Sequence, residues 1–222
     1  MENQPVFIEI IKADSGRYLN LEGHAVRMDR TMRRFFRQPF VQPTLEKLLP
    51  APPDSGISKL TVQYGDSIIS TEFSNYERPV VRSLAMVDPG QMDYIFKSRD
   101  RERLSAIKDF SGADEAIIVR NGFITNVTCA NLVFRDNSGA LFTPLHYIHS
   151  GTKREYYVKT KTVTAYPIKF DQLASYESVT LVNAMLDMDD DVTFPCSLIS
   201  PLVTMPVPEG GTPGPPGASG EL

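Results

Sequence analysis

The chain of 222 residues is 41% hydrophobic and 23% charged, and its 23 Lys and Arg against 27 Asp and Glu give a formal net charge of −4. This composition is typical of a globular chain that buries its own core. It offers neither the basic excess of a nucleic-acid-binding protein nor an apolar run that could span a membrane. The N-terminus lacks a signal-peptide pattern, and Cys129 and Cys196 lie outside any C-x-x-C motif. We therefore expect a reduced, cytoplasmic chain, either an enzyme or a binding protein.

The N-terminal part of the chain predicts strands around a helix. The segment 6–12, VFIEIIK, is rich in β-branched and aromatic side chains and predicts a strand. Apolar and basic residues recur every three or four positions over 22–36, which predicts a helix. The segments 58–64 and 67–73 alternate around Gly65-Asp66, which predicts a hairpin whose turn takes positive φ angles.

The rest of the chain predicts more strand than helix, and therefore a mixed α+β fold. Strands are expected at 80–87, 115–120, 123–127, 131–135, 141–143, 163–168 and 179–186. A helix is expected from Ser98 or Asp100 to about Asp109, whereas 153–162 fits either a helix or, by its Thr and Tyr content, a strand. The segment 196–222 is rich in Pro and Gly and predicts a disordered tail.

Common catalytic signatures are missing from the sequence, which has no G-x-S-x-G, no P-loop and no G-x-G-x-x-G. His146 and His149 are three residues apart, but no Cys or carboxylate cluster accompanies them. Solvated loop histidines are therefore favoured over a metal site, and no metal is expected. The acidic run 187–191 lacks the alternating ligands and the Gly of a calcium loop, so a solvated turn is favoured there.

Several short segments carry a family resemblance through their order and spacing. They are 20–28 with its L-x-x-H-x-x-R pattern, 94–101, 113–119, 122–134, 141–144, 150–154 and 182–185. Together they resemble the class IV aminotransferase family of fold-type IV pyridoxal-phosphate enzymes. This group contains branched-chain and D-amino acid aminotransferases and 4-amino-4-deoxychorismate lyase. The K-x-x-D-R stretch at 97–101 and the N-A-M segment within 182–185 are similar to a short branch of the family.

The resemblance implies an α+β fold with a small N-terminal α/β domain and a larger pseudo-barrel domain. These would cover 1–88 and 92–195, with the tail at 196–222. Pyridoxal 5'-phosphate would lie in the cleft between the domains. The family is usually homodimeric, so a homodimer is implied as well, with no nucleic-acid or membrane partner.

The resemblance also assigns roles to single residues. Lys97 would form the Schiff base with the cofactor and act as the catalytic base, which requires a desolvated amine. An exposed lysine is the alternative from sequence alone. Arg27 would bind the cofactor phosphate, or be one more cation on a basic helix face. The other implied cofactor-binding residues are Asn126, Asn131, Gly151, Thr152, Asn183 and Ala184.

Three positions depart from the family pattern. Asn126 replaces the carboxylate, commonly Glu, that pairs with the pyridine nitrogen, and an amide cannot supply the counter-charge. Electron withdrawal by the cofactor should therefore be weaker. Arg101 stands near a position where the family often has Tyr or His, and it either faces a substrate carboxylate or lies in an exposed basic run. Lys153 replaces the usual Thr in the phosphate loop.

Three functions remain open. A 4-amino-4-deoxychorismate lyase would eliminate pyruvate and leave 4-aminobenzoate for folate synthesis. This reaction gains an aromatic ring and tolerates a weaker electron sink, so Asn126 and the short chain favour it. An aminotransferase acting on branched-chain or D-amino acids is the alternative. A non-catalytic relative that keeps the fold is the third reading.

Overall fold

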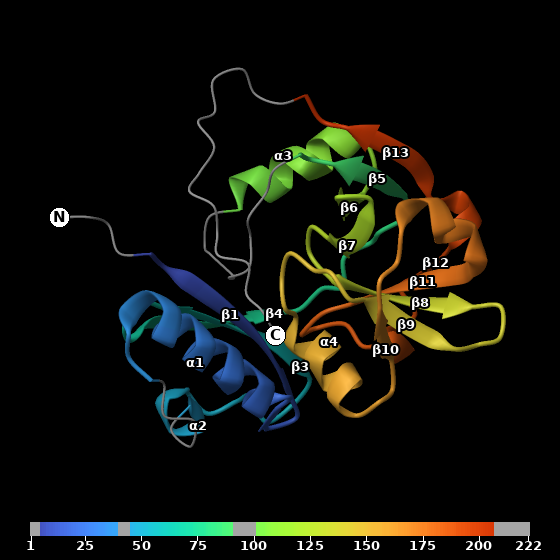
Figure 1. Ribbon diagram of the computed structural model, residues 1–222. Helices are drawn as coiled ribbons and strands as arrows, with labels where there is room; N and C mark the ends of the chain where they lie inside the picture. The colour runs from blue at the N-terminus through green and yellow to red at the C-terminus, as the bar shows by residue number, and fades with distance from the viewer. Residues whose placement is uncertain (1–4, 40–44, 91–100, 207–222) are drawn as a thin grey trace.

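The computed structural model describes residues 5–39, 45–90 and 101–206 (Figure 1). The helices are α1 (Leu21–Phe36), α2 (Leu45–Leu48), α3 (Glu102–Ser111) and α4 (Thr152–Lys159). The strands are β1 (Phe7–Asp14), β2 (Arg17–Tyr18), β3 (Ile57–Tyr64), β4 (Ile68–Asn75), β5 (Leu84–Asp88), β6 (Glu115–Arg120), β7 (Phe123–Val127), β8 (Asn131–Asp136), β9 (Leu141–Pro144), β10 (Thr164–Tyr166), β11 (Tyr176–Val182), β12 (Thr193–Pro195) and β13 (Ser200–Thr204). Short 3₁₀ helices cover Phe170–Ser175, Met188–Asp190 and Cys196–Leu198. The mixed α+β fold class is confirmed.

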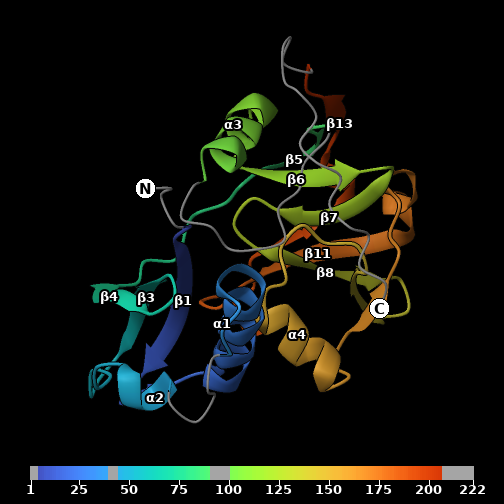
Figure 2. The same cartoon turned by 60° about the vertical axis from the view of Figure 1, so that its left-hand side comes forward.

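The first unit is a four-stranded sheet of order β2-β1-β3-β4, with α1 and α2 on one face (Figures 1 and 2). Alternate side chains of β1 point in opposite directions, as the two-residue period of a strand requires. Ile11 and Phe7 pack with Met28 and Leu60 in the core between the sheet and α1. This packing fixes the position of α1 relative to β1, and with it the position of the polar side chains of α1 that face the sheet.

The predicted hairpin between β3 and β4 is confirmed, but the expected turn geometry is wrong. Neither Gly65 nor Asp66 adopts a positive φ. The connection spans three residues, with the Gly65 N–H donating to the Ser67 carbonyl at 2.9 Å, and the pairing register shifts next to Tyr64. A longer loop with an irregular strand end removes the need for the left-handed angles of a two-residue turn.

The second unit is built from two sheets that face each other. Their orders are β13-β5-β6-β7 and β10-β9-β8-β11-β12. Leu84 and Ile117 of one sheet share a core with Phe134 and Val179 of the other, which gives the barrel-like body that the family resemblance implies. Because β5 pairs with β6 and β13, residues 84–88 belong to this unit. The predicted domain boundary at 88 was therefore too late.

The predicted start of the disordered tail is also wrong. Residues 196–198 form a 3₁₀ helix with Cys196 buried, and β13 follows and pairs in parallel with β5. Pro195 and Pro201 suggested disorder, yet proline is tolerated at an edge strand, and β13 lies at the edge of its sheet. The part of the segment from 207 onward lies outside the described residues.

Helix α4 lies beside α1 and connects the two units (Figures 1 and 2). The segment that fitted either helix or strand is helical over Thr152–Lys159, because Tyr157 packs with Val133 and Val182 of the second unit. Tertiary packing here outweighs the strand propensity of Thr and Tyr. None of the described helices is both long and apolar enough to cross a membrane.

Candidate active site

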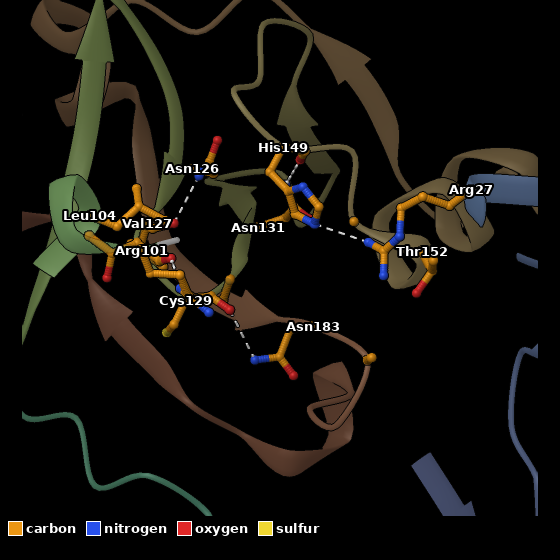
Figure 3. A pocket seen from close by; sticks show the side chains of 14 residues that line it. Arg27, Arg101, Leu104, Asn126, Val127, Cys129, Asn131, His149, Thr152 and Asn183 are labelled. Atoms are coloured by element: carbon orange, nitrogen blue, oxygen red, sulfur yellow. Dashed lines mark hydrogen bonds between the residues drawn. The ribbon is translucent and has the colours of Figure 1, made fainter. Parts of the chain in front are cut away.

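One pocket gathers the predicted site residues where the two units meet (Figure 3). It is lined by Arg27, Arg101, Asn126, Asn131, Gly151, Thr152, Asn183 and Ala184, together with Leu104, residues 127–130 and His149. Arg27 comes from α1, Asn126 from β7 and Thr152 from the start of α4. Lys97, the predicted Schiff-base lysine, lies outside the described residues.

Arg27 forms one end of the pocket and is held by several partners. Its Nε and Nη2 donate to the carboxylate of Glu9 at 2.8 and 2.5 Å. Its Nη1 donates to the Ser150 carbonyl at 3.1 Å and lies 3.0 Å from His149 Nε2. Two parallel contacts to one carboxylate fix the plane of a guanidinium. Arg27 is therefore a rigid part of the pocket wall, unlike a solvated cation on a basic helix face.

The start of α4 forms the same end of the pocket. By helix geometry, the N–H groups of its first turn have no acceptor within the helix. Gly151 stands directly before the helix, and a Cβ there would lie 1.8 Å from Asn131 Oδ1. Asn131 in turn donates through Nδ2 to the His149 carbonyl at 3.1 Å. The loop therefore approaches β8 more closely than any residue with a side chain allows, and Asn131 holds it there.

Asn126 is buried and its amide is oriented by the backbone. Its Oδ1 accepts from the Ile148 N–H at 2.9 Å, and its Nδ2 donates to the Val127 carbonyl at 2.8 Å. An amide nitrogen carries two hydrogens, so one further donation is compatible with this orientation. The side chain is thus a fixed donor at the pocket wall and not a counter-ion.

Asn183 shapes the turn that closes the lower side of the pocket in Figure 3. Its Oδ1 accepts from the N–H groups of Met185 and Leu186 at 2.8 and 3.0 Å, and its Nδ2 donates to the Cys129 carbonyl at 3.3 Å. These bonds position the neighbouring Ala184 on the pocket wall. The amide of Asn183 is therefore engaged in holding the turn.

Arg101 lies across the pocket from Arg27 (Figure 3). It is half-buried, and its Nη2 donates to the Thr128 carbonyl at 2.6 Å. Beside it, burial and the negative charge of Glu115 raise the pKa of the Cys129 thiol to about 12. A positive group and a neutral thiol thus face the end of the pocket remote from α4. This placement differs from the exposed basic run considered from the sequence.

Two functional candidates were missed or misjudged from the sequence. His149 was expected to be a solvated loop histidine, but it lines the pocket and contacts Arg27. Its position directly before the loop 150–154 was the available signal. Glu9 was not singled out at all, although it is fully buried and holds Arg27. A carboxylate within a strongly apolar strand was the signal for it, since such a group requires a partner.

The acidic run 187–191 was expected to be a solvated turn, but its first residue is a structural anchor. Asp187 accepts from Lys153 and from Lys12 at 3.4 Å, and the Tyr157 hydroxyl donates to it at 3.1 Å. These charges hold the pKa of Asp187 below its usual range, although burial alone would raise it. Lys153, which departs from the family pattern, therefore joins α4 to the turn, and Lys12 joins β1 of the first unit to the same carboxylate.

Comparisons with known proteins place the fold. No model of a known protein family matches the chain. An uncharacterized protein of Haemophilus influenzae is 25% identical over 185 residues, which cover 82% of this chain and 97% of that protein. A proposed 4-amino-4-deoxychorismate lyase from Haemophilus somnus 129PT is similar in structure, with a TM-score of 0.72 and 27% identity over 83% of this chain and 98% of that one.

A further similar structure is that of an aminotransferase from Brucella abortus bound to PLP. Its TM-score is 0.62 and its identity is 13%, over 90% of this chain and 81% of that one. The fold is therefore that of the fold-type IV aminotransferases and lyases, as expected from the sequence motifs. The structural matches show this fold and do not specify the reaction.

Proposed function

We propose that this protein is a PLP-dependent 4-amino-4-deoxychorismate lyase, which eliminates pyruvate from its substrate and leaves 4-aminobenzoate. The observation that carries the proposal is the gathering of eight predicted site residues, distant in sequence, on one pocket. The structural match between this chain and a proposed 4-amino-4-deoxychorismate lyase supports the choice of the lyase reaction. We extend the proposal to a cytoplasmic homodimer acting in folate synthesis.

The pocket residues fit the phosphate of PLP. The guanidinium of Arg27 and the first turn of α4 face the same end of the pocket, and both attract anions. The absence of a side chain at Gly151 lets the backbone come close, and Thr152 adds a hydroxyl. When bound, PLP supplies the electron sink for cleavage at the substrate α-carbon.

Asn126 fits the pyridine nitrogen as a neutral donor. Its second amide hydrogen can donate to an unprotonated nitrogen, whereas a carboxylate would hold that nitrogen protonated. The weaker electron sink that results is adequate for a reaction that gains an aromatic ring. This chemical argument favours the lyase over transamination.

Arg101 binds the substrate in this proposal, at the opposite end of the pocket from the phosphate. Its contact with the Thr128 carbonyl holds the guanidinium in place, and a planar guanidinium recognises a carboxylate with two hydrogen bonds. Lys97 bonds the cofactor, and the Nζ of Lys97 then carries the α-proton of the substrate. Arg101 therefore binds the substrate, and Lys97 transfers its proton.

The first test is an absorbance titration of the purified protein with PLP, repeated after borohydride reduction. We expect a band that borohydride traps on the protein and that the Lys97→Ala variant lacks. Lys47→Ala, which removes an exposed lysine, is the matched control and should retain the trapped band. A wild-type protein that shows no band would favour the non-catalytic relative.

The second test separates the two enzymatic functions. Release of pyruvate from aminodeoxychorismate supports the lyase, whereas exchange of amino groups between an amino acid and a 2-oxo acid supports the aminotransferase. The aminotransferase remains the second candidate because an aminotransferase is among the structural matches. The Asn126→Glu variant should change the cofactor spectrum or raise the rate. No change in either would contradict the assigned role of Asn126.

A further inference from the structure

A single buried carboxylate lies behind the phosphate end of the pocket. Glu9 is on β1, is fully buried and faces the inner side of α1. Besides its two contacts with Arg27, its Oε2 lies 2.6 Å from Nδ1 of His24, which is also buried. Glu9 therefore contacts two side chains of α1, His24 and Arg27, which are three residues apart and lie on the same face of the helix.

His24 extends the connection from Glu9 to α4. Its other ring nitrogen, Nε2, lies 3.4 Å from the Thr152 hydroxyl oxygen, and the Asn20 side chain donates to the Thr152 carbonyl at 3.0 Å. One carboxylate on β1 is thus linked to Arg27 directly and to Thr152 through an imidazole. These are the two side chains assigned to the phosphate.

Glu9 is ionised in this arrangement. Burial alone would raise its pKa, but the charge of Arg27 and the hydrogen bond from His24 outweigh burial and hold the pKa well below its usual range. An ionised carboxylate and a guanidinium form two short parallel contacts, which neutral groups cannot reproduce. The orientation of Arg27 therefore depends on the charge and the length of this side chain.

We propose that Glu9 is the positioning residue of the phosphate site, orienting Arg27 directly and Thr152 through His24. The proposal rests on the proposed function, because it concerns the phosphate of PLP. An Arg side chain has many rotamers, and fixing it beforehand removes an entropy cost that binding would otherwise meet. Glu9 acts through these residues and does not itself contact the ligand.

A simple counter-ion role makes the opposite prediction. If Glu9 only balanced the charge of Arg27, its removal would make the pocket more positive and would strengthen the binding of an anion. If Glu9 positions Arg27, its removal weakens recognition of the phosphate although the pocket becomes more positive. The sign of the effect therefore separates the two roles.

The experiment compares the affinity of the protein for PLP with its affinity for pyridoxal, which lacks the phosphate. The Kd for pyridoxal divided by the Kd for PLP, both measured by absorbance titration, reports recognition of the phosphate, and a lower ratio means weaker recognition. Pyridoxal forms an internal hemiacetal in water, so only the change in this ratio between variants is compared. For Glu9→Gln, we expect the ratio to fall about tenfold, the effect of losing a charge-assisted contact, with the pyridoxal affinity little changed.

Further variants complete the test. Glu9→Asp keeps the charge but shortens the side chain, so positioning predicts the same fall and charge balance predicts none. Thr31→Val is the matched control, since it removes another buried polar group on α1 without a contact to the Arg27 guanidinium, and it should leave the ratio unchanged. Thermal melting of each variant checks that it is folded. If neither position-9 variant folds, His24→Asn decides, because it shortens the side chain that links Glu9 to Thr152 and leaves Arg27 and Thr152 themselves in place. Positioning then predicts a lower ratio, and charge balance predicts no change.

An unchanged or increased ratio in a folded variant overturns the positioning role. That outcome is distinct from failure of the proposed function, in which the wild-type protein would not bind PLP or would show no preference for it over pyridoxal. A protein that prefers PLP and keeps that preference in the Glu9 variants would retain its function and lose only this inference.

Discussion

Substitution of Gly151 by alanine tests the close approach between the pocket loop and β8. The added Cβ would lie 1.8 Å from Asn131 Oδ1, which is far inside van der Waals contact. Asn131 is buried and bonds the His149 carbonyl, so it cannot move aside without breaking that bond. We expect Gly151→Ala to force either a rotation of Asn131 or a displacement of the loop.

The expected cost follows from these two options. Breaking the hydrogen bond costs about 1 kcal/mol and overpacking of a tight site about 1–3 kcal/mol, so about 1–3 kcal/mol of unfolding free energy should be lost by either route. For a chain of this size, 1 kcal/mol lowers Tm by about 2–4 °C, and a drop of roughly 2–12 °C follows. Differential scanning calorimetry measures it. Affinity for PLP should fall as well, because Gly151 lines the pocket.

The controls use the same chain. Gly65→Ala adds a Cβ whose nearest neighbours are 3.8 Å away, so it should change stability by less than about 0.5 kcal/mol. In the double variant, Asn131→Ala removes the obstructing oxygen, so the two substitutions together should cost less than the sum of the single costs. An unchanged Tm for Gly151→Ala, or strictly additive costs, would refute the reasoning.

Three further predictions concern charge and burial. Because the pKa of Glu9 is lowered well below its usual range in the folded state, its contribution to stability is fully present above about pH 5. It is lost progressively as the pH falls below the unfolded-state pKa of about 4.3 toward the folded-state pKa, so Glu9→Gln should flatten the acid side of a stability-versus-pH curve. Burial raises the pKa of both Cys129 and Cys196 to about 12, so neither thiol should react with a disulfide reagent at pH 8 until the protein is unfolded. Asp187→Asn leaves the largely buried Lys153 without its carboxylate and should lower the unfolding free energy by about 2 kcal/mol in a urea titration.

Each of these predictions has a contrary outcome. Identical acid slopes for the wild type and the Glu9→Gln variant would show that the carboxylate titrates alike in the folded and unfolded states. Rapid labelling of a native thiol would place it at the surface. A fully stable Asp187→Asn variant would mean that solvent or other groups already satisfy the lysine.

The elements with a strong local pattern were predictable from the sequence. The β-branched and aromatic content of β1 and the three- and four-residue periodicity of α1 predicted strand and helix within a residue or two of their observed bounds. The order of the short motifs also predicted the fold class. The strand and helix patterns are local in the chain, and the fold class follows from the order of short local motifs. Neither prediction requires knowledge of how distant residues pack.

The features that depend on distant partners were not predictable. Strand β13 follows Pro195 and contains Pro201, and it forms because β5 has an edge beside it that pairs with it. The role of Glu9 depends on Arg27, and that of Lys153 on Asp187, which lies 34 residues away. Analysis of the sequence one segment at a time identifies the residue types in such pairs, but it does not show that the two side chains are in contact.

Strand β1 also sets a limit on how this protein can change in length. Its odd-numbered residues, including Glu9, face α1, whereas Lys12 points to the other side and reaches Asp187. Because β1 and β3 pair along their whole length, an insertion or deletion of one residue within β1 would reverse the facing of the strand on one side of the change. It would therefore turn Glu9 away from Arg27, or Lys12 away from Asp187, or both. Length variation should therefore be tolerated between the two units, over 76–83, and rejected within this strand.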